Sequence, residues 1–316
     1  VLEGIREEAG DDVRILYSQG CDLYKDKVEN LAWDQDRISE AVITAENSDV
    51  VILCVGLDET LEGEEGDTGN SDASGDKVDL HLPKVQEELI EKVTAVGKPT
   101  IVVLMAGSAI DLNYAQDNCN GILLAWYPGA RGGRAIADLL FGKESPSGKL
   151  PVTFYKDLEG MPEFTDYSMK NRTYRYMEKE ALYPFGYGLT YSDTCVTEAE
   201  VVGEVSAESD IMLKATVKNN GTVDTDEVVQ VYIKDLDSPL AVRNYSLCGF
   251  KRVSLKAGEE KSVEFTISNK AMNIVDEDGN RYIAGKHFRL FAGVSQPDTR
   301  SAELTGHKPA EVEIAL

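Results

Sequence analysis

The hydrophobic pattern of this chain changes its period near residue 192, which predicts two different kinds of structure. In the first half, continuous apolar runs are typical of strands buried on both faces of a sheet. These runs lie at residues 50–56, 99–105 and 121–126. Between the first two runs, Val85, Leu89 and Val93 recur at helical spacing. Strands that alternate with helices predict right-handed crossovers and a mainly parallel α/β sheet.

Shorter patterns add further elements to this half. We predict helices over residues 2–10, 36–47 and 134–141, and an early strand with the sequence VRILY at Val13–Tyr17. A short helix is also expected from Ala109, with the hydroxyl of Ser108 as its cap.

Beyond Ser192 the apolar residues alternate with polar ones, which is the period of half-buried strands. The strands with this period read VTEAEVVG, IMLKATVKN, EVVQVYI, LCGFKRVSL, KSVEFTIS and HFRLFAGVS. Turn sequences separate them, including Asn219–Gly221 and Glu277–Asn280. Short strands at this spacing predict a β-sandwich of the immunoglobulin or fibronectin type.

These patterns give an α/β plus all-β chain with three parts. Residues 1–160 are predicted to form an α/β domain, 161–192 a connector, and 193–316 a β-sandwich. The connector has no clear period but is rich in tyrosine and phenylalanine between Tyr174 and Tyr191. That composition favours a packed connector or a sugar-facing wall over a flexible linker.

An acidic loop, GLDETLEGEEGD at residues 56–67, leaves the carboxyl end of the first buried run. Loops at that end of parallel strands are where α/β domains place their chemistry. Six acidic residues crowd into this loop. We expect their mutual repulsion to raise the pKa of at least one carboxyl group into a range suited to proton donation. A solvated acidic loop or a metal-ion cage explains the same density of charge.

The composition of the chain limits the kinds of partner that we expect it to bind. The chain has 316 residues and a formal net charge of -24, which disfavours nucleic acid as a partner. No apolar stretch approaches the roughly 20 residues of a membrane-spanning helix, so we expect no membrane partner. Five widely spaced cysteines predict buried free thiols and a reducing, cytoplasmic compartment. They are Cys21, Cys54, Cys119, Cys195 and Cys248.

No metal site and no cofactor are predicted. The three histidines, His81, His287 and His307, are too scattered to suggest zinc ligation. The glycines at 129, 132 and 133 allow tight turns before a helix, but the chain carries neither GxGxxG nor a GK[ST] ending. A phosphate-binding loop is therefore disfavoured there.

Several longer motifs resemble family 3 of the glycoside hydrolases, the β-glucosidase and β-xylosidase group. They are GLDETLEGEEGD, AWYPGARGGRAIADLLFGKESPSGKLPVTF, YRYMEKEALYPFGYGLTY, VKNNGTVDTDEVVQVYI and GFKRVSLKAGEEKSVEFTI. Together they cover nearly the whole chain. The resemblance implies a six-stranded α/β sandwich followed by a fibronectin-III-like β-sandwich, both normally attached to a (β/α)8 barrel.

The resemblance also implies a retaining β-glycosidase that cleaves terminal β-linked sugars by double displacement. In such enzymes the barrel supplies the nucleophilic aspartate and the α/β sandwich supplies the general acid/base. The family pattern of Val-Gly, five residues and then Glu selects Glu62 as the acid/base. Glu64 is the backup and Glu65 a further competitor. The supporting carboxylates would be Asp58, Glu59 and Asp67.

The chain departs from the family in two places. Asp67-Thr68 stands where the family usually has Asp-Arg, so Glu62 is assigned from the strand side alone. The barrel's nucleophile motif, a Ser followed by Asp-Trp, is absent. Lys286-His287 matches a substrate-binding pair of the barrel, but its surroundings alternate like a sandwich strand.

We therefore expect the chain to be inactive alone. Its expected partners are the barrel domain of the same protein, a β-linked gluco- or xylo-oligosaccharide, and a second copy in a homodimer. The substrate-contacting residues are not predicted. Two other classes stay open: a structural or carbohydrate-binding module with an inert acidic loop, and a flavodoxin-like nucleotide-binding domain. The second class accounts for the first half alone.

Overall fold

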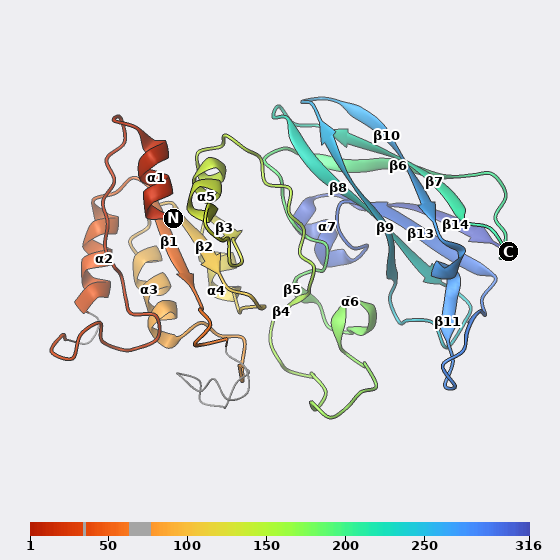
Figure 1. The fold of residues 1–316 in the computed structure, drawn as a ribbon, viewed down its shortest axis with the longest axis horizontal. Coiled ribbons are helices and arrows are strands. Elements are labelled where there is room, and N and C mark those ends of the chain that lie inside the picture. The colour runs from red at the N-terminus through yellow and green to blue at the C-terminus, as the bar shows by residue number, and fades with distance from the viewer. Residues whose placement is uncertain (34–35, 63–76) are drawn as a thin grey trace. The chain divides into compact units, whose positions relative to one another are not determined.

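The computed structural model describes residues 1–33, 36–62 and 77–316 (Figure 1). The chain forms two compact units. Unit 1 comprises Val1–Lys143 and Lys156–Leu158, and unit 2 comprises Glu144–Tyr155 and Glu159–Leu316. No helix among the described residues is both long and apolar enough to cross a membrane.

Unit 1 is built on three parallel strands, as the apolar runs predict. The sheet has the order β1-β2-β3, with β1 at Val51–Gly56, β2 at Thr100–Met105 and β3 at Gly121–Leu124. The central strand is the most deeply buried, because Val102, Val103 and Leu104 are fully inaccessible to solvent. A parallel sheet covered by helices accounts for these continuous apolar runs.

Five helices belong to unit 1, within the described residues. They are α1 (Leu2–Ala9), α2 (Asp36–Glu46), α3 (Lys84–Thr94), α4 (Asn113–Asn118) and α5 (Gly132–Leu140). Helix α3 connects β1 to β2 and turns Leu89, Ile90 and Val93 into the core. Helices α1 and α5 pack together at Gly4, where a Cβ atom would lie 2.1 Å from the carbonyl oxygen of Gly133.

Three expectations from the sequence are wrong. The segment Val13–Tyr17 joins no sheet, and its two end residues are 46% and 60% exposed. The sheet formed by the described residues has three strands, where the family resemblance implies six. The five cysteines are free, but only Cys195 is buried. Cys54 is exposed because β1 is an outer strand of the described sheet.

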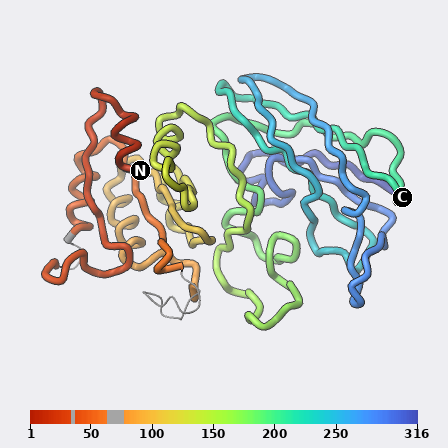
Figure 2. The backbone as a smooth tube through the Cα atoms, in the orientation of Figure 1, coloured from red at the N-terminus to blue at the C-terminus, as the bar shows by residue number. Residues whose placement is uncertain are grey.

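Unit 2 is the predicted β-sandwich, with two antiparallel sheets. One sheet has the order β10-β7-β6 and the other β14-β13-β8-β9. The strands are β6 (Thr194–Val202), β7 (Ile211–Asn219), β8 (Thr225–Asp235), β9 (Ser246–Leu255), β10 (Glu260–Ile267), β13 (His287–Gly293) and β14 (Ala310–Ala315). The backbone trace in Figure 2 follows these strands through the blue-green part of the chain.

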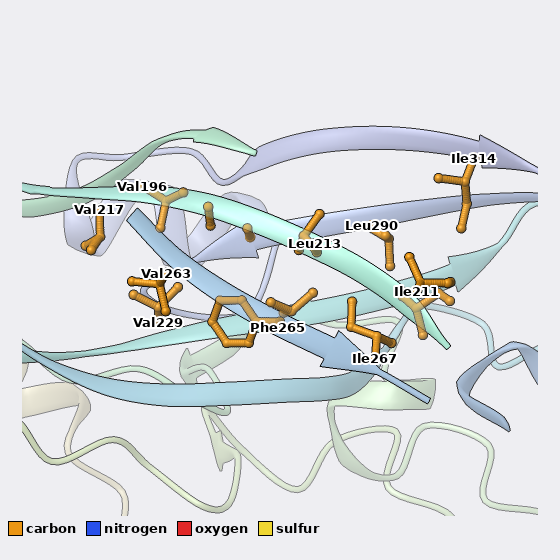
Figure 3. Close-up of a cluster of buried hydrophobic side chains, with 14 of the residues drawn as sticks. Val196, Ile211, Leu213, Val217, Val229, Val263, Phe265, Ile267, Leu290 and Ile314 are labelled. Carbon is orange, nitrogen blue, oxygen red and sulfur yellow. The ribbon is translucent and has the colours of Figure 1, made fainter. Parts of the chain in front are cut away.

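The core of the sandwich lies between the two sheets. Figure 3 shows Ile211 and Leu213 of β7, Phe265 of β10 and Leu290 of β13 pointing toward one another. On β7, buried and more exposed residues alternate along the strand, which is the period that the sequence displays. The apolar positions of the two sheets therefore form one continuous core.

Shorter elements complete unit 2. They are β4 (Phe154–Tyr155), α6 (Thr173–Tyr176), β5 (Ala181–Tyr183), the 3-10 helix η1 (Asn269–Met272), β11 (Asn273–Val275), β12 (Arg281–Ile283) and α7 (Thr299–Thr305). The aromatic connector is packed rather than free: Tyr174 stacks on Phe185 with 4.3 Å between ring centroids. Both rings contact the fully buried Tyr232 of β8 edge to face.

Candidate active site

Glu62 lies beyond the carboxyl end of β1, on the acidic loop that the sequence singles out. Gly107 and Ser108 follow the end of β2, and Tyr127 follows the end of β3. Because the three strands are parallel neighbours, these loops share one edge of the sheet. Glu62 is the residue on which they converge.

Three donors bind the carboxylate of Glu62. The hydroxyl of Ser108 donates to Oε1, and the hydroxyl of Tyr127 donates to Oε2. The backbone N–H of Gly107 also donates to Oε2, at 2.8 Å. We refer to Ser108, Gly107 and Tyr127 as the donor clamp. Tyr127 remains 51% exposed, so the site is open to solvent on that side.

The start of the acidic loop is fixed by Gly56 and by a buried glutamine. Gly56 has a φ of 153°, and a Cβ atom there would lie 1.8 Å from the carbonyl oxygen of Met105. The side chain of Gln86 on α3 accepts from the N–H of Gly56 at 2.7 Å and donates to its carbonyl at 2.7 Å. It also donates to the carbonyl of Leu23 at 2.6 Å. The chain therefore leaves β1 in one defined direction.

A tight turn then presents Glu62. The carboxylate of Asp58 accepts from the N–H of Thr60 at 3.0 Å and from its hydroxyl at 2.7 Å. The N–H of Glu62 donates to the carbonyl of Asp58 at 3.0 Å. Leu57 and Leu61 are buried and anchor the turn to unit 1. Asp58 therefore shapes the backbone that leads to Glu62.

Close packing leaves the donor clamp little freedom. A Cβ atom on Gly107 would lie 2.9 Å both from Oε2 of Glu62 and from the ring of Tyr127. Directly before Tyr127, Trp126 has a φ of 51°, a left-handed conformation that costs a residue with a side chain about 1–2 kcal/mol. Such a torsion persists only where the surrounding structure fixes it.

The pKa of Glu62 is lower than its ordinary value, so Glu62 is not the carboxyl group with a raised pKa that the sequence predicts somewhere in this loop. Burial alone raises this pKa, because it penalises the charged form. The hydrogen bonds from the donor clamp and the positive charge of Lys77 favour the charged form and outweigh burial. The expectation assumed crowded carboxylates, whereas the described neighbours of Glu62 are donors.

The pKa values of Lys77 and of Tyr127, a member of the donor clamp, are also shifted. Burial lowers the pKa of Lys77, while the charges of Glu62 and Asp79 oppose that shift. Its ammonium group donates to the carbonyl oxygen of Ala109 at 3.1 Å. Burial and then the carboxylate of Glu62 raise the pKa of Tyr127, which keeps its hydroxyl protonated as a donor.

The structure assigns Ser108 a role that the sequence did not. The helix expected from Ala109 begins instead at Asn113. The hydroxyl of Ser108 binds Glu62 and does not cap that helix. Tyr127 and Lys77 were also missed. The available signal was position, since Ser108 and Tyr127 each follow a predicted parallel strand. Glu64, Glu65 and Asp67 lie outside the described residues.

The arrangement can move one proton at one carboxyl group. Among residues 1–33, 36–62 and 77–316, no three His, Cys, Asp or Glu side chains gather as ligands of a metal ion. Retaining hydrolysis of a glycoside needs two carboxylates roughly 5–5.5 Å apart. Glu62 can serve as one of them.

Two family models match this chain, in separate stretches. Residues 1–191 match the glycosyl hydrolase family 3 C-terminal domain, and residues 227–296 match a fibronectin type III-like domain. A β-xylosidase of Formosa agariphila is 34% identical over 313 residues, which are 96% of this chain and 41% of that protein. A xylan 1,4-β-xylosidase of Xylanibacter ruminicola is 39% identical over 270 residues, or 84% of this chain and 31% of that protein.

A solved structure shows the same architecture. A β-glucosidase from Erythrobacter marinus superimposes with a TM-score of 0.82 at 31% identity, over 100% of this chain and 43% of that one. The chain thus spans well under half the length of these relatives. The match to the family 3 C-terminal domain covers more than half of the residues of this chain, and the chain therefore belongs to family 3 of the glycosyl hydrolases.

Proposed function

We propose that this chain is the acid/base-bearing part of a retaining β-glycosidase, with Glu62 as the general acid/base. The observation that carries the proposal is the convergence of three strand-end donors on one half-exposed carboxylate. The nucleophile would be an aspartate on a (β/α)8 barrel outside this chain. Relatives named as β-xylosidases and β-glucosidases support terminal β-linked xylosides or glucosides as substrates.

Glu62 would act twice in the reaction. In the first step its proton goes to the glycosidic oxygen, while the nucleophile attacks the anomeric carbon and the bond to the leaving group breaks. In the second step the carboxylate takes a proton from water, whose oxygen attacks the same carbon and releases the nucleophile.

The lowered pKa of Glu62 suits only the second of these steps, in which the carboxylate is charged. For the first step the group must hold a proton. A second carboxylate within about 5.5 Å would supply the repulsion that raises its pKa. We therefore propose that the proton is held only when the barrel and a sugar complete the site, and that this chain alone does not hydrolyse glycosides.

The test uses the whole enzyme that contains this chain. With Glu62→Ala, we expect cleavage of a glycoside with a poor leaving group to fall about 10²- to 10⁴-fold. A nitrophenyl glycoside does not need the acid in the first step, so added azide should restore turnover and yield a glycosyl azide. Glu91→Ala is the matched control, since Glu91 is an exposed glutamate of α3 to which no role in the site is assigned.

Three results would contradict the proposal in different ways. If Glu64→Ala, and not Glu62→Ala, responds to azide, the acid/base is Glu64. If neither variant loses activity, the acidic loop is inert and the chain is a structural or carbohydrate-binding module. Turnover of nitrophenyl glucoside by the purified chain, abolished by Glu62→Gln, would show that no barrel is needed.

A further inference from the structure

The two oxygens of Glu62 have different surroundings. We propose that Tyr127, together with the N–H of Gly107, is a positioning residue that anchors Oε2 of Glu62, so that Oε1 is the oxygen that exchanges the proton with substrate. This inference rests on the proposed function of Glu62. It adds which oxygen reacts and which side chain decides it.

The two oxygens of Glu62 differ in how many of their lone pairs accept a hydrogen bond. A carboxylate oxygen has two lone pairs. Both lone pairs of Oε2 are used, one by the N–H of Gly107 and one by the hydroxyl of Tyr127. Oε1 accepts a single hydrogen bond, from Ser108. Among the described residues, the open lone pair of Glu62 therefore lies on Oε1.

Protonation on Oε1 leaves the donor clamp intact. In the neutral acid, Oε2 becomes the carbonyl oxygen and still accepts two donors. Oε1 then carries the proton on its open side and keeps its hydrogen bond from Ser108. Protonation on Oε2 would instead displace a donor, either Gly107 or Tyr127. The contacts therefore permit proton transfer at Oε1 without any rearrangement.

The anchor is preformed by the backbone. Gly107 is fixed at the end of β2, and its lack of a side chain allows Oε2 and the Tyr127 ring to approach from the same side. The left-handed torsion of Trp126 sets the direction in which Tyr127 leaves β3. A preorganised donor of this kind needs no movement at the moment of reaction.

The other groups that act electrostatically on this pair are few among the described residues. Lys77 acts on Glu62, and Asp58 acts on Tyr127. Among the described residues, the side chains of Lys77 and Asp58 form no ion pair or hydrogen bond with the carboxylate of Glu62, so the three hydrogen bonds of the donor clamp dominate its surroundings. Loss of the Tyr127 hydroxyl should therefore be visible in the ionisation of Glu62.

The test compares Tyr127→Phe with the unaltered whole enzyme. The alkaline limb of kcat/KM reports the group that must be protonated. Loss of one donor to the charged form should move that limb upward by about one pH unit. We expect kcat to fall about tenfold for an unactivated glycoside and less than about twofold for a dinitrophenyl glycoside, with KM unchanged.

Matched variants separate positioning from mere damage to the fold. Ser108→Ala should move the alkaline limb upward with a smaller loss of kcat, because Oε2 stays anchored, and Ser108→Thr should restore the wild-type profile. Tyr114→Phe is the control, since the hydroxyl of that exposed α4 tyrosine contacts Thr94. Tyr127 is half-exposed, so its truncation to Phe should leave the fold intact.

The inference is overturned if Tyr127→Phe keeps the alkaline limb within about 0.2 pH units of wild type and affects both leaving groups equally. Glu62→Ala with azide is run in the same series. If azide still rescues that variant, only the positioning role of Tyr127 fails. If Glu62→Ala is fully active, the proposed function itself fails.

Discussion

Two glutamates, one in each unit, are held by the same kinds of group. Glu62 of unit 1 binds two hydroxyls and one backbone N–H, with Lys77 as the nearby cation. Glu227 of unit 2 binds the hydroxyl of Thr194 at 2.5 Å and the N–H of Val228 at 2.6 Å. It also forms an ion pair with Lys149 at 2.8 Å.

Burial and pairing distinguish them. The side chains of Glu227 and Lys149 are only 2% and 8% exposed, and the ammonium group of Lys149 also donates to the carbonyl of Gly188 at 2.6 Å. All three oxygen–donor contacts of Glu227 are thus enclosed in unit 2. Glu62 keeps an open lone pair on Oε1, and the tyrosine that binds its other oxygen is half-exposed. The comparison teaches that similar donors make a carboxylate structural when it is enclosed and available for chemistry when it is not.

Removal of Glu227 should have the largest effect on stability. Glu227→Ala leaves Lys149 buried without its partner, which typically costs 3–5 kcal/mol, so we expect a loss of about 4 kcal/mol in the free energy of unfolding. Urea unfolding of the chain, followed by circular dichroism, measures it. Glu264→Ala, at an exposed residue of β10, should change the same quantity by less than about 0.5 kcal/mol.

Replacement of both partners should cost less. Lys149→Met combined with Glu227→Leu leaves no unpaired charge, so we expect the double variant to be about 2 kcal/mol more stable than Glu227→Ala. Thr194 and Val228 would still lose their acceptor, which prevents full recovery. A double variant no more stable than the single one would mean that the ion pair is not what Glu227 contributes.

Removal of Glu62 should hardly change stability. Because Glu62 is only half-buried, we expect Glu62→Ala to alter the free energy of unfolding of the chain by less than about 1 kcal/mol. The same substitution is expected to abolish most activity of the whole enzyme. A stability loss as large as that of Glu227→Ala would remove the distinction between the two sites.

The smallest expected effect is the pH dependence of the contribution that Glu62 makes to the free energy of unfolding. A lowered pKa of Glu62 in the folded state stabilises the fold above the ordinary glutamate pKa of about 4.3, and this contribution is lost as the pH falls through the folded value. The difference in unfolding free energy between wild type and Glu62→Gln should therefore shrink from pH 5.5 toward pH 3.5, by roughly 0.5 kcal/mol, given solvent screening. A difference that grows in acid would mean that the folded pKa is raised.

Most elements were predictable where burial leaves a plain pattern. Continuous apolar runs marked the three parallel strands, and alternation marked six sandwich strands. Strand β14 was missed, although Ala310, Val312 and Ile314 alternate with polar residues as a strand requires. The segment Val13–Tyr17 shows the converse error, since β-branched and aromatic residues alone did not place it in a sheet.

The site was predictable only in part. Counting from β1 selects Glu62, but its donors Gly107, Ser108 and Tyr127 lie 45, 46 and 65 positions away along the chain. Local patterns carry no information about contacts at that separation. Ser108 illustrates the difficulty, since a serine before an apolar stretch is also what a helix cap looks like.

The residue at the position of Gly107 indicates whether another sequence can form the same site. Its backbone conformation does not demand glycine; the room required by Glu62 and Tyr127 does. A homologue with a larger residue at the corresponding position must have shifted its carboxylate or its tyrosine. Alanine at that position, which alters no ionisable group, would show how much of the reaction depends on space alone.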